Sequence, residues 1–219
     1  MRTVFICGIG TGIGKTLVAA ILTEKLKADY WKPVQAGNLD DSDTDFVRRL
    51  VSNNQSVFHP ERFRLTQPMS PHVAAEIDGV EIKLEDFKIP ETKNNLVIEG
   101  AGGLLVPLSG KLLLIEVIEQ LNAEVILVSQ NYLGSINHTL LSAEALKARN
   151  IKVTGIVFNG EPYPQGEDII LRHTGFRCLA RVPQMKDISR ESIKLLAESL
   201  EFNKLHSAII NNHNLGSGC

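Results

Sequence analysis

Short apolar runs rich in β-branched and aromatic residues alternate along this chain with longer segments whose apolar residues recur at helical spacing. Residues 4–7 form the first run, and residues 16–27 then repeat apolar side chains three or four positions apart, as on one face of a helix. Further runs of the strand type lie at residues 96–98, 125–128 and 153–158, and helical patterns lie at residues 137–148 and 189–202. This alternation predicts an α/β fold with a mostly parallel sheet and helices on both of its faces.

One stretch interrupts the alternation. Residues 38–92 are polar and contain four prolines, Pro60, Pro68, Pro71 and Pro90. Such a stretch predicts short helices and loops over the edge of the sheet where an active site would lie, and not a second domain. The length of 219 residues also favours a single domain, and we expect the polar residues 211–219 to form a flexible tail.

The charge and cysteine content narrow the classes of function. Lys and Arg number 23 and Asp and Glu number 25, so the net charge of −2 leaves no basic excess to hold a nucleic-acid backbone. The three cysteines, Cys7, Cys178 and Cys219, lack the paired spacing of a zinc site or a disulfide framework, which fits a reducing cytoplasm. The first apolar run is too short for a signal peptide or a membrane helix, so we expect neither export nor a membrane partner.

A glycine-rich segment, Gly8-Ile9-Gly10-Thr11-Gly12-Ile13-Gly14-Lys15-Thr16, lies where the first strand gives way to the first helix. In this context the N–H groups of the loop can surround phosphate oxygens, and the start of the helix adds its positive dipole end. We expect Lys15 to reach the β- and γ-phosphates of ATP and the Thr16 hydroxyl to bind Mg²⁺. The pattern predicts a P-loop NTPase fold with an extended loop, because Ile9 stands where the usual spacing places the first glycine.

Charged residues follow two more of the predicted strands. Residues 30–37 are expected to form the second strand, with Lys32 at its carboxyl end, where a parallel sheet faces its ligands. An ammonium group there can neutralise charge that develops on a phosphate or carboxylate. Glu99 ends a further apolar strand and is the expected carboxylate ligand of Mg²⁺. The glycine-rich segment after it, with Gly100 and Gly102, leaves N–H groups free to bind an anion.

Six segments of the chain together resemble one family. They are residues 8–16, Trp31-Lys32-Pro33-Val34, Ser42-Asp43, Ser70-Pro71-His72, residues 99–103 with Val106-Pro107-Leu108, and residues 133–138. In their order, and over most of the chain from residue 3 to about residue 159, they resemble dethiobiotin synthetases. The resemblance implies a homodimeric, ATP-dependent cyclo-ligase. Such an enzyme joins 7,8-diaminononanoate and CO₂ or bicarbonate, through a carbamate and a carbamic-phosphoric anhydride, into dethiobiotin with release of ADP and phosphate.

The resemblance also assigns roles to matching positions. It implies that Lys32, Lys15 and Thr11 are catalytic and that Thr16, Asp43 and Glu99 hold Mg²⁺. It implies contacts with the nucleotide from Gly12, Ile13, Gly14, Lys15, Thr16, Leu17, Asp43, Glu99, Gly100, Gly102 and Asn159. The implied substrate contacts are Thr11, Lys32 and Ala36, together with Ser135, Ile136 and Asn137 at the start of a helix of the partner subunit. A helix N-terminus suits the distant carboxylate of that substrate.

Some positions leave alternatives open. Ala36 stands where the family often has a serine or threonine, so Gln35 or Asn38 can replace that contact with the substrate. Asp45 competes with Asp43 as the metal ligand, and on composition alone the acidic loop of residues 40–45 is a solvated surface. Taken by itself, the serine at the start of the 135–137 segment is equally consistent with ordinary helix capping.

Two other functions remain alternatives. One is a partitioning or switch ATPase, in which a signature lysine lies early in the loop; this chain has Gly10 there, which counts against it. The other is a different P-loop ligase acting on another carboxylate. Beyond Asn159 the sequence is only loosely similar to the family, so the preference for adenine stays open. We assign no proton-transfer role to His72 or His138, because structural histidines are more common.

Overall fold

The computed structural model describes residues 2–200, and its centre is a parallel sheet of seven strands in the order β4-β2-β6-β1-β7-β8-β9. The strands are β1 (Thr3–Gly8), β2 (Asp29–Trp31), β4 (Phe58–His59), β6 (Leu96–Glu99), β7 (Glu124–Gln130), β8 (Val153–Asn159) and β9 (Cys178–Val182). A separate pair of parallel strands, β3 (Val34–Ala36) and β5 (Phe63–Leu65), lies beside the main sheet.

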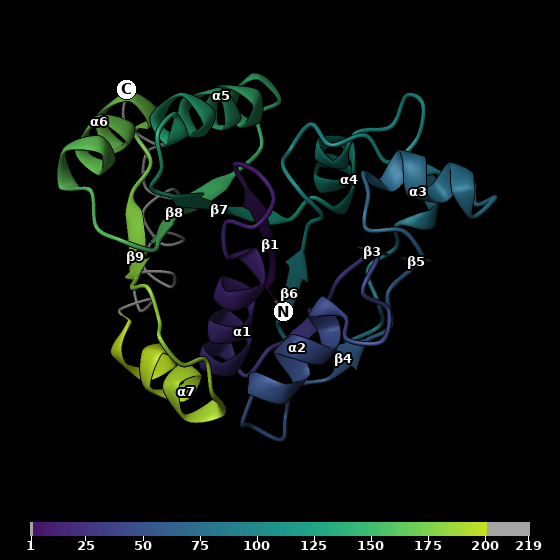
Figure 1. Ribbon diagram of the computed structural model, residues 1–219, viewed down its shortest axis with the longest axis horizontal. Helices are drawn as coiled ribbons and strands as arrows, with labels where there is room; N and C mark the ends of the chain where they lie inside the picture. The colour runs from purple at the N-terminus through teal and green to yellow at the C-terminus, as the bar shows by residue number, and fades with distance from the viewer. Residues whose placement is uncertain (1, 201–219) are drawn as a thin grey trace, which may run out of the picture.

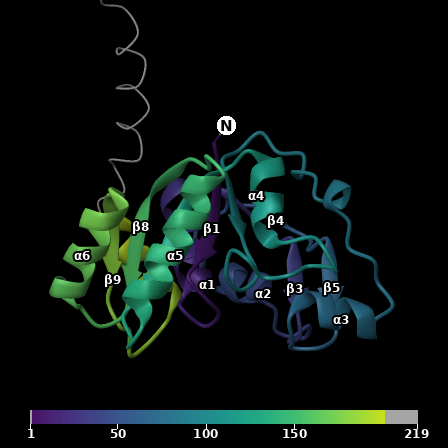
Figure 2. The same cartoon turned by 90° about the horizontal axis from the view of Figure 1, so that it is seen from above.

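Helices cover both faces of the sheet (Figures 1 and 2). One face packs against α1 (Lys15–Leu26), α2 (Asp43–Leu50) and α7 (Arg190–Ser199). The other packs against α4 (Leu114–Leu121), α5 (Ser135–Ala148) and α6 (Pro164–Thr174). The remaining elements, α3 (Pro71–Ile77) and the 3₁₀ turn η1 (Leu84–Asp86), lie in the segment that carries β3 and β5.

Strand β1 shows how the sequence divides the core in two. Its residues alternate between the faces, because side chains of a strand point to opposite sides in turn. Val4 and Ile6 join the cluster under α1, whereas Phe5 and Cys7 join the cluster under α4 and α5. All four are buried, so both faces of the central strand are apolar, as expected for a parallel sheet between helix layers.

The expected α/β P-loop fold is confirmed, with differences at several boundaries. The prediction of one continuous second strand over residues 30–37 was wrong. The chain leaves the main sheet after Trp31 and forms β3 only from Val34, because Pro33 has no N–H group to donate to a ladder. The sequence pattern did not predict α4, α6 or β9.

Two further expectations concern the C-terminal residues and membrane-spanning helices. Helix α7 ends at Ser199, and residues 201 and 202 of the expected last helix lie outside the described residues, as does the expected tail at 211–219. Within residues 2–200, no helix is long and apolar enough to cross a membrane.

Candidate active site

Three strand ends bring the predicted charged residues to one edge of the sheet. Strand β6 lies between β2 and β1, with Trp31 opposite Ile98 and Ile6 opposite Glu99. Because all three strands are parallel, the phosphate loop after β1, Lys32 after β2 and the end of β6 meet at the same carboxyl edge.

The phosphate loop is held in shape by a contact from a distant strand. Gly14 caps helix α1 with φ 91°, a left-handed conformation that favours glycine. The Asn159 side chain at the end of β8 donates from Nδ2 to the carbonyl of Ile13 at 3.0 Å. A Cβ on Gly14 would lie 2.2 Å from that Nδ2 atom, so only glycine fits between the loop and β8.

Lys15 is buried beneath the loop. Its Nζ donates to the carbonyl of Gly10 at 2.7 Å. Burial lowers the pKa of Lys15 to about 8, although the nearby Glu99 carboxylate raises it in part. A buried ammonium that lies close to a neutral carbonyl is ready to receive a stronger anionic partner, such as a phosphate.

Glu99 is the centre of a buried hydrogen-bond network. Its Oε1 accepts from the Thr16 hydroxyl at 2.8 Å and from Lys32 Nζ at 3.0 Å. Its Oε2 accepts from the Tyr30 hydroxyl at 2.7 Å. Burial by itself would lower the pKa of Lys32, but the Glu99 and Asp43 carboxylates outweigh it and raise that pKa. Lys32 is therefore a charged group in this site at neutral pH.

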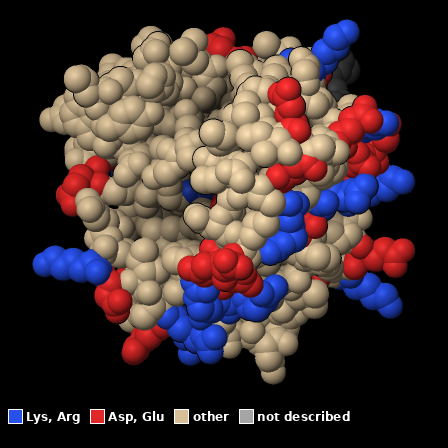
Figure 3. Space-filling view, turned by 45° about the vertical axis from the view of Figure 1, so that its right-hand side comes forward, with Lys and Arg blue, Asp and Glu red and all other residues tan. Residues whose placement is uncertain are grey.

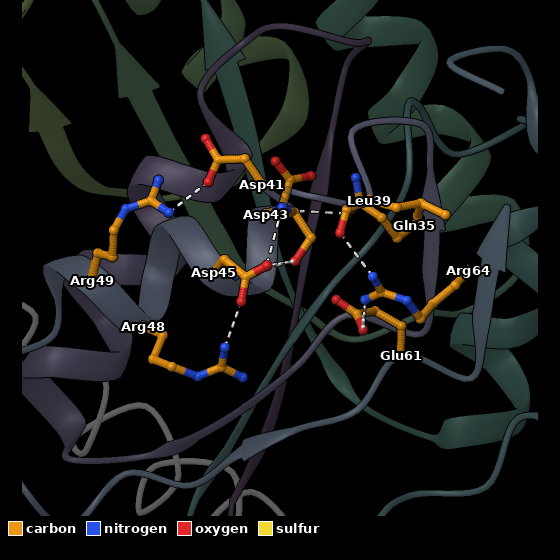
Figure 4. A network of polar contacts seen from close by, with 10 residues as sticks. Gln35, Leu39, Asp41, Asp43, Asp45, Arg48, Arg49, Glu61 and Arg64 are labelled. Carbon is orange, nitrogen blue, oxygen red and sulfur yellow. Dashed lines mark hydrogen bonds and ion pairs between the residues drawn. The ribbon is translucent and has the colours of Figure 1, made fainter. Parts of the chain in front are cut away.

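The acidic loop separates its carboxylates by role (Figure 4). Asp43 Oδ2 lies 2.7 Å from Lys32 Nζ. Asp45 is engaged elsewhere: its Oδ2 accepts from the N–H and hydroxyl of Ser42 in the capping box of α2, and its Oδ1 pairs with Arg48 at 2.5 Å. In Figure 4 the Asp43 carboxylate points away from Arg48, toward which Asp45 points. Of the two, Asp43 belongs to the site.

Two adjoining clefts open over this network. The first, of about 380 Å³, is lined by the phosphate loop residues Thr11 to Leu17 except Ile13, with Lys32, Asp43, Phe46, Glu99 and Gly102. The second, of about 470 Å³, shares four of these residues and adds Val34, Gln35, Ala36, Pro68, Met69, Ser70, Pro71, Ala101 and Val106. Both volumes suit small ligands. Figure 3 shows a hollow near the centre of one face with Lys or Arg surface in its floor.

The alanine at position 36 gives the second cleft an apolar wall. Gln35 is buried, and its side chain is engaged within the protein: Oε1 accepts from the Asp43 N–H at 3.3 Å and Nε2 donates to the Gly37 carbonyl at 2.9 Å. Asn38 lines neither cleft. The Gln35 amide thus holds the start of α2 in place.

The start of α5 lies apart from these two clefts. Its N-cap is Gly134, with φ 101°, so the interpretation of Ser135 as an ordinary N-cap was wrong. Ser135 is buried and its Oγ accepts from the Tyr132 N–H at 3.3 Å. Ile136 is partly buried and Asn137 is exposed, and neither lines the two clefts. This chain by itself does not bring the segment to its own two clefts.

The oxygen atoms at the first cleft suit a magnesium ion. The Thr16 hydroxyl bonds to the Glu99 carboxylate, and the carboxylates of Asp43 and Glu99 both lie within 3.0 Å of the Lys32 ammonium, so these three oxygen-bearing groups lie close together. Hard oxygen ligands of this number, completed by phosphates, are what Mg²⁺ takes in nucleotide sites. Among the described residues no cluster of three acidic, His or Cys side chains forms an all-protein metal site.

Two members of this network were not predicted from the sequence: Tyr30, and Gln35 as a support of Asp43. The signal for Tyr30 was its position two residues before Lys32, since residues two apart in a strand share a face. No comparable signal existed for Gln35, because its partner is a backbone N–H on another element.

Comparison with known proteins agrees with this geometry. Residues 2–192 match a family model described as an AAA domain. The chain is 52% identical over 201 residues to the ATP-dependent dethiobiotin synthetase of Cytophaga hutchinsonii, covering 91% of this chain and 97% of that protein. It is 50% identical over 197 residues to the enzyme of the same name from Christiangramia forsetii, covering 90% and 95%.

Solved structures of similar fold are far more distant in sequence. The ParA family ATPase of Chlorobium tepidum has a TM-score of 0.55 and 14% identity, covering 94% of this chain and 93% of its own. The septum site-determining protein MinD of Pyrococcus horikoshii, solved with Mg-ADP, has a TM-score of 0.55 and 16% identity, covering 94% and 98%. These likenesses show the P-loop fold alone. At 50% identity or more over nine-tenths of its length, the chain belongs to the family of ATP-dependent dethiobiotin synthetases.

Proposed function

We propose that this enzyme carboxylates 7,8-diaminononanoate with CO₂ and closes the ureido ring of dethiobiotin at the expense of one ATP. The observation that carries the proposal is the pair of adjoining clefts that share Thr11, Lys32, Asp43 and Gly102. One cleft offers phosphate and metal ligands, and the other offers an apolar wall for an aliphatic chain. Their shared lysine stands where the two reactants would meet.

The nucleotide is proposed to bind along the phosphate loop. Lys15 and the loop N–H groups from Gly12 to Leu17 would hold the β- and γ-phosphates in the first cleft, which Gly102 also lines. Gly100, next to Glu99, and Asn159, which bonds to the loop, are proposed as further nucleotide contacts outside the lining of that cleft. Thr16, Asp43 and Glu99 would hold Mg²⁺, which when bound neutralises phosphate charge. The Asn159 amide already donates to Ile13, so its position is fixed before any base arrives.

The reaction needs two negatively charged groups to approach. One amine of the substrate attacks CO₂ and loses a proton, giving a carbamate. A carbamate oxygen then attacks the γ-phosphorus, forming a carbamic-phosphoric anhydride and ADP. Lys15 and Lys32, with Thr11 beside them, would offset the repulsion between carbamate and phosphate. The second amine finally attacks the carbonyl carbon, which closes the ring and releases phosphate.

A homodimer is proposed because Lys32, which is paired with Asp43 and Glu99, is the one cationic group among the described residues that line the second cleft, so the distant carboxylate of the substrate would have no cation of its own there. The start of α5, with Ser135, Ile136 and Asn137, is proposed to serve the partner's cleft. The exposure of Leu133 and Leu141 beside it, at 103% and 61%, supports an apolar contact between subunits. The proposed location is the cytoplasm, supported by the free thiols of Cys7 and Cys178.

The experiment that tests this function is a mass-spectrometric assay of the purified protein. It combines 7,8-diaminononanoate, bicarbonate, Mg²⁺ and ATP, and omits one component at a time. Dethiobiotin that forms only in the complete mixture supports the reaction. ATP hydrolysis without the diamine, and no cyclic urea in any mixture, would sink the substrate assignment while leaving nucleotide binding intact. Replacing ATP by GTP or CTP in the same assay measures the preference for the base.

A further inference from the structure

One side chain in contact with Glu99 has no role in the reaction described so far. Tyr30 lies on β2 with its side chain in the cluster under α1, and Lys32 follows directly after the last residue of that strand. Val97 lies opposite Tyr30 on β6, and Glu99 follows Val97 on the same face. The register of β2 and β6 therefore brings the Tyr30 hydroxyl to one oxygen of the Glu99 carboxylate, at 2.7 Å, and the Lys32 ammonium lies 3.0 Å from the other oxygen.

Packing alone does not account for the hydroxyl of Tyr30. The side chain is fully buried in the apolar cluster under α1, with its ring 6.3 Å from that of Phe58. A phenylalanine would make the same apolar contacts, whereas a buried hydroxyl without a partner is costly. The one hydrogen bond that the hydroxyl makes in the described structure goes to Glu99 Oε2. Its presence is explained by that carboxylate.

The bond restricts what the carboxylate can do. With Oε2 held by Tyr30, only Oε1 faces Thr16 and Lys32. If Oε2 were released, the carboxylate could rotate and present both oxygens to the Lys32 ammonium, since a free carboxylate accepts through either atom. A carboxylate that is shared in this way with a lysine is less available to a cation at the Thr16 side.

We propose that Tyr30 is a positioning residue that fixes the rotation of Glu99 and thereby its availability to Mg²⁺. This proposal rests on the assignment of Glu99 to the metal under the proposed function. It concerns how strongly Mg²⁺ adds to nucleotide affinity, and it assigns Tyr30 no contact with substrate, nucleotide or metal.

The test compares the wild type with Tyr30→Phe by isothermal titration calorimetry of ADP, once with Mg²⁺ and once with EDTA. Affinity without metal is expected to stay within about twofold, since the phosphate loop is untouched. The gain in affinity that Mg²⁺ provides is expected to fall about tenfold, the scale of one hydrogen bond to a charged group. A second hydroxyl-free variant, Tyr30→Leu, should show the same loss of the Mg²⁺ gain with a lower melting temperature.

The matched control is Ile21→Val, which removes one methyl group from the same buried cluster away from Glu99. It should lower the melting temperature and leave the Mg²⁺ gain unchanged. An equal loss of affinity with and without Mg²⁺ in Tyr30→Phe, or a gain within about twofold of wild type, overturns the proposal. Calorimetry uses no diamine, so its result does not depend on the proposed reaction. A wild type that shows the Mg²⁺ gain but makes no dethiobiotin would contradict the proposed reaction and not the proposed role of Tyr30.

Discussion

Binding of a nucleotide is expected to take up a proton on Lys15. In the free protein, burial lowers the pKa of this lysine to about 8 despite the nearby Glu99 carboxylate, and its Nζ donates to the neutral carbonyl of Gly10. Phosphate oxygens brought to the loop would favour the charged form and return the pKa toward its ordinary range. Lys15 is charged below pH 8 and loses its charge above it, so affinity should fall as the pH rises through that value.

The size of the effect follows from this pKa. If the bound phosphates keep Lys15 charged, about 0.1 proton is taken up at pH 7, about 0.5 at pH 8 and about 0.9 at pH 9. The charged fraction in the free protein falls about tenfold between pH 7 and pH 9, so the association constant of ADP should fall by a similar factor. The ADP phosphate titrates near pH 6 and adds little to the uptake above pH 8.

Calorimetry of ADP in two buffers of different ionisation enthalpy gives the number of protons directly at each pH. The matched control is Lys15→Arg, because a guanidinium stays charged throughout this range. This variant should bind ADP more weakly and show no uptake above pH 7.5. The reasoning is refuted if the wild type takes up less than about 0.1 proton at every pH between 7.5 and 9, or if Lys15→Arg takes up as much as the wild type.

Three further predictions follow from other contacts of the network and the core. Asp43→Asn should reduce the Mg²⁺ gain in ADP affinity, whereas Asp45→Asn should keep it and cost about 1 kcal/mol in urea unfolding through the weakened cap of α2; the reverse pattern would move the metal ligand to Asp45. Lys32→Ala should lower steady-state turnover at least ~10²-fold, and turnover near that of wild type would remove its catalytic role. Burial alone would raise the pKa of Asp29, but hydrogen bonds to its carboxylate, led by the one from Thr92, outweigh burial and lower the pKa. The charged carboxylate therefore stabilises the fold above about pH 4, and this stabilisation is lost as the pH falls through the lowered pKa. Asp29→Asn should therefore flatten the fall of melting temperature with acid, and an unchanged slope would contradict this account.

The central layers of the fold could be predicted because their sequence signals are local. Three apolar runs can be recognised as strands from their length and composition alone, and each forms a strand of the main sheet: residues 4–7, 125–128 and 153–158. The two-residue strand β4 gives no such signal, since its pairing with β2 depends on where the chain passes and not on its own composition. Helix α4 was hidden because its N-cap position is Leu113, and not one of the polar residues that usually mark the start of a helix.

The site residues likewise fall into those that local sequence signals predicted and those that they did not. Lys15, Thr16 and Glu99 stand at fixed distances from a glycine-rich loop or a strand end, so sequence predicted that they would meet, and the structure brings them together. The resemblance favoured Asp43 with Asp45 as the alternative, but composition could not separate them, because both are carboxylates in one acidic run. In the structure Asp45 completes the capping box of α2 with the N-cap Ser42, three residues before it, whereas Asp43 pairs with Lys32.

The strand register explains why so much of the site depends on one face of the sheet. Tyr30 from β2, Lys32 directly after that strand and Glu99 from β6 meet on the α1 side of the sheet, where the first turn of α1 supplies Thr16. The residue between the first two, Trp31, points the other way into the core beneath α4, where its indole N–H bonds to the carbonyl of Pro60 at 3.1 Å. A change at Trp31 should therefore act on activity through stability, whereas a change at Tyr30 acts on the carboxylate itself. A shift of β2 by one residue would exchange these two sets, so the pairing of β2 with β6 is as much a part of the site as the side chains are.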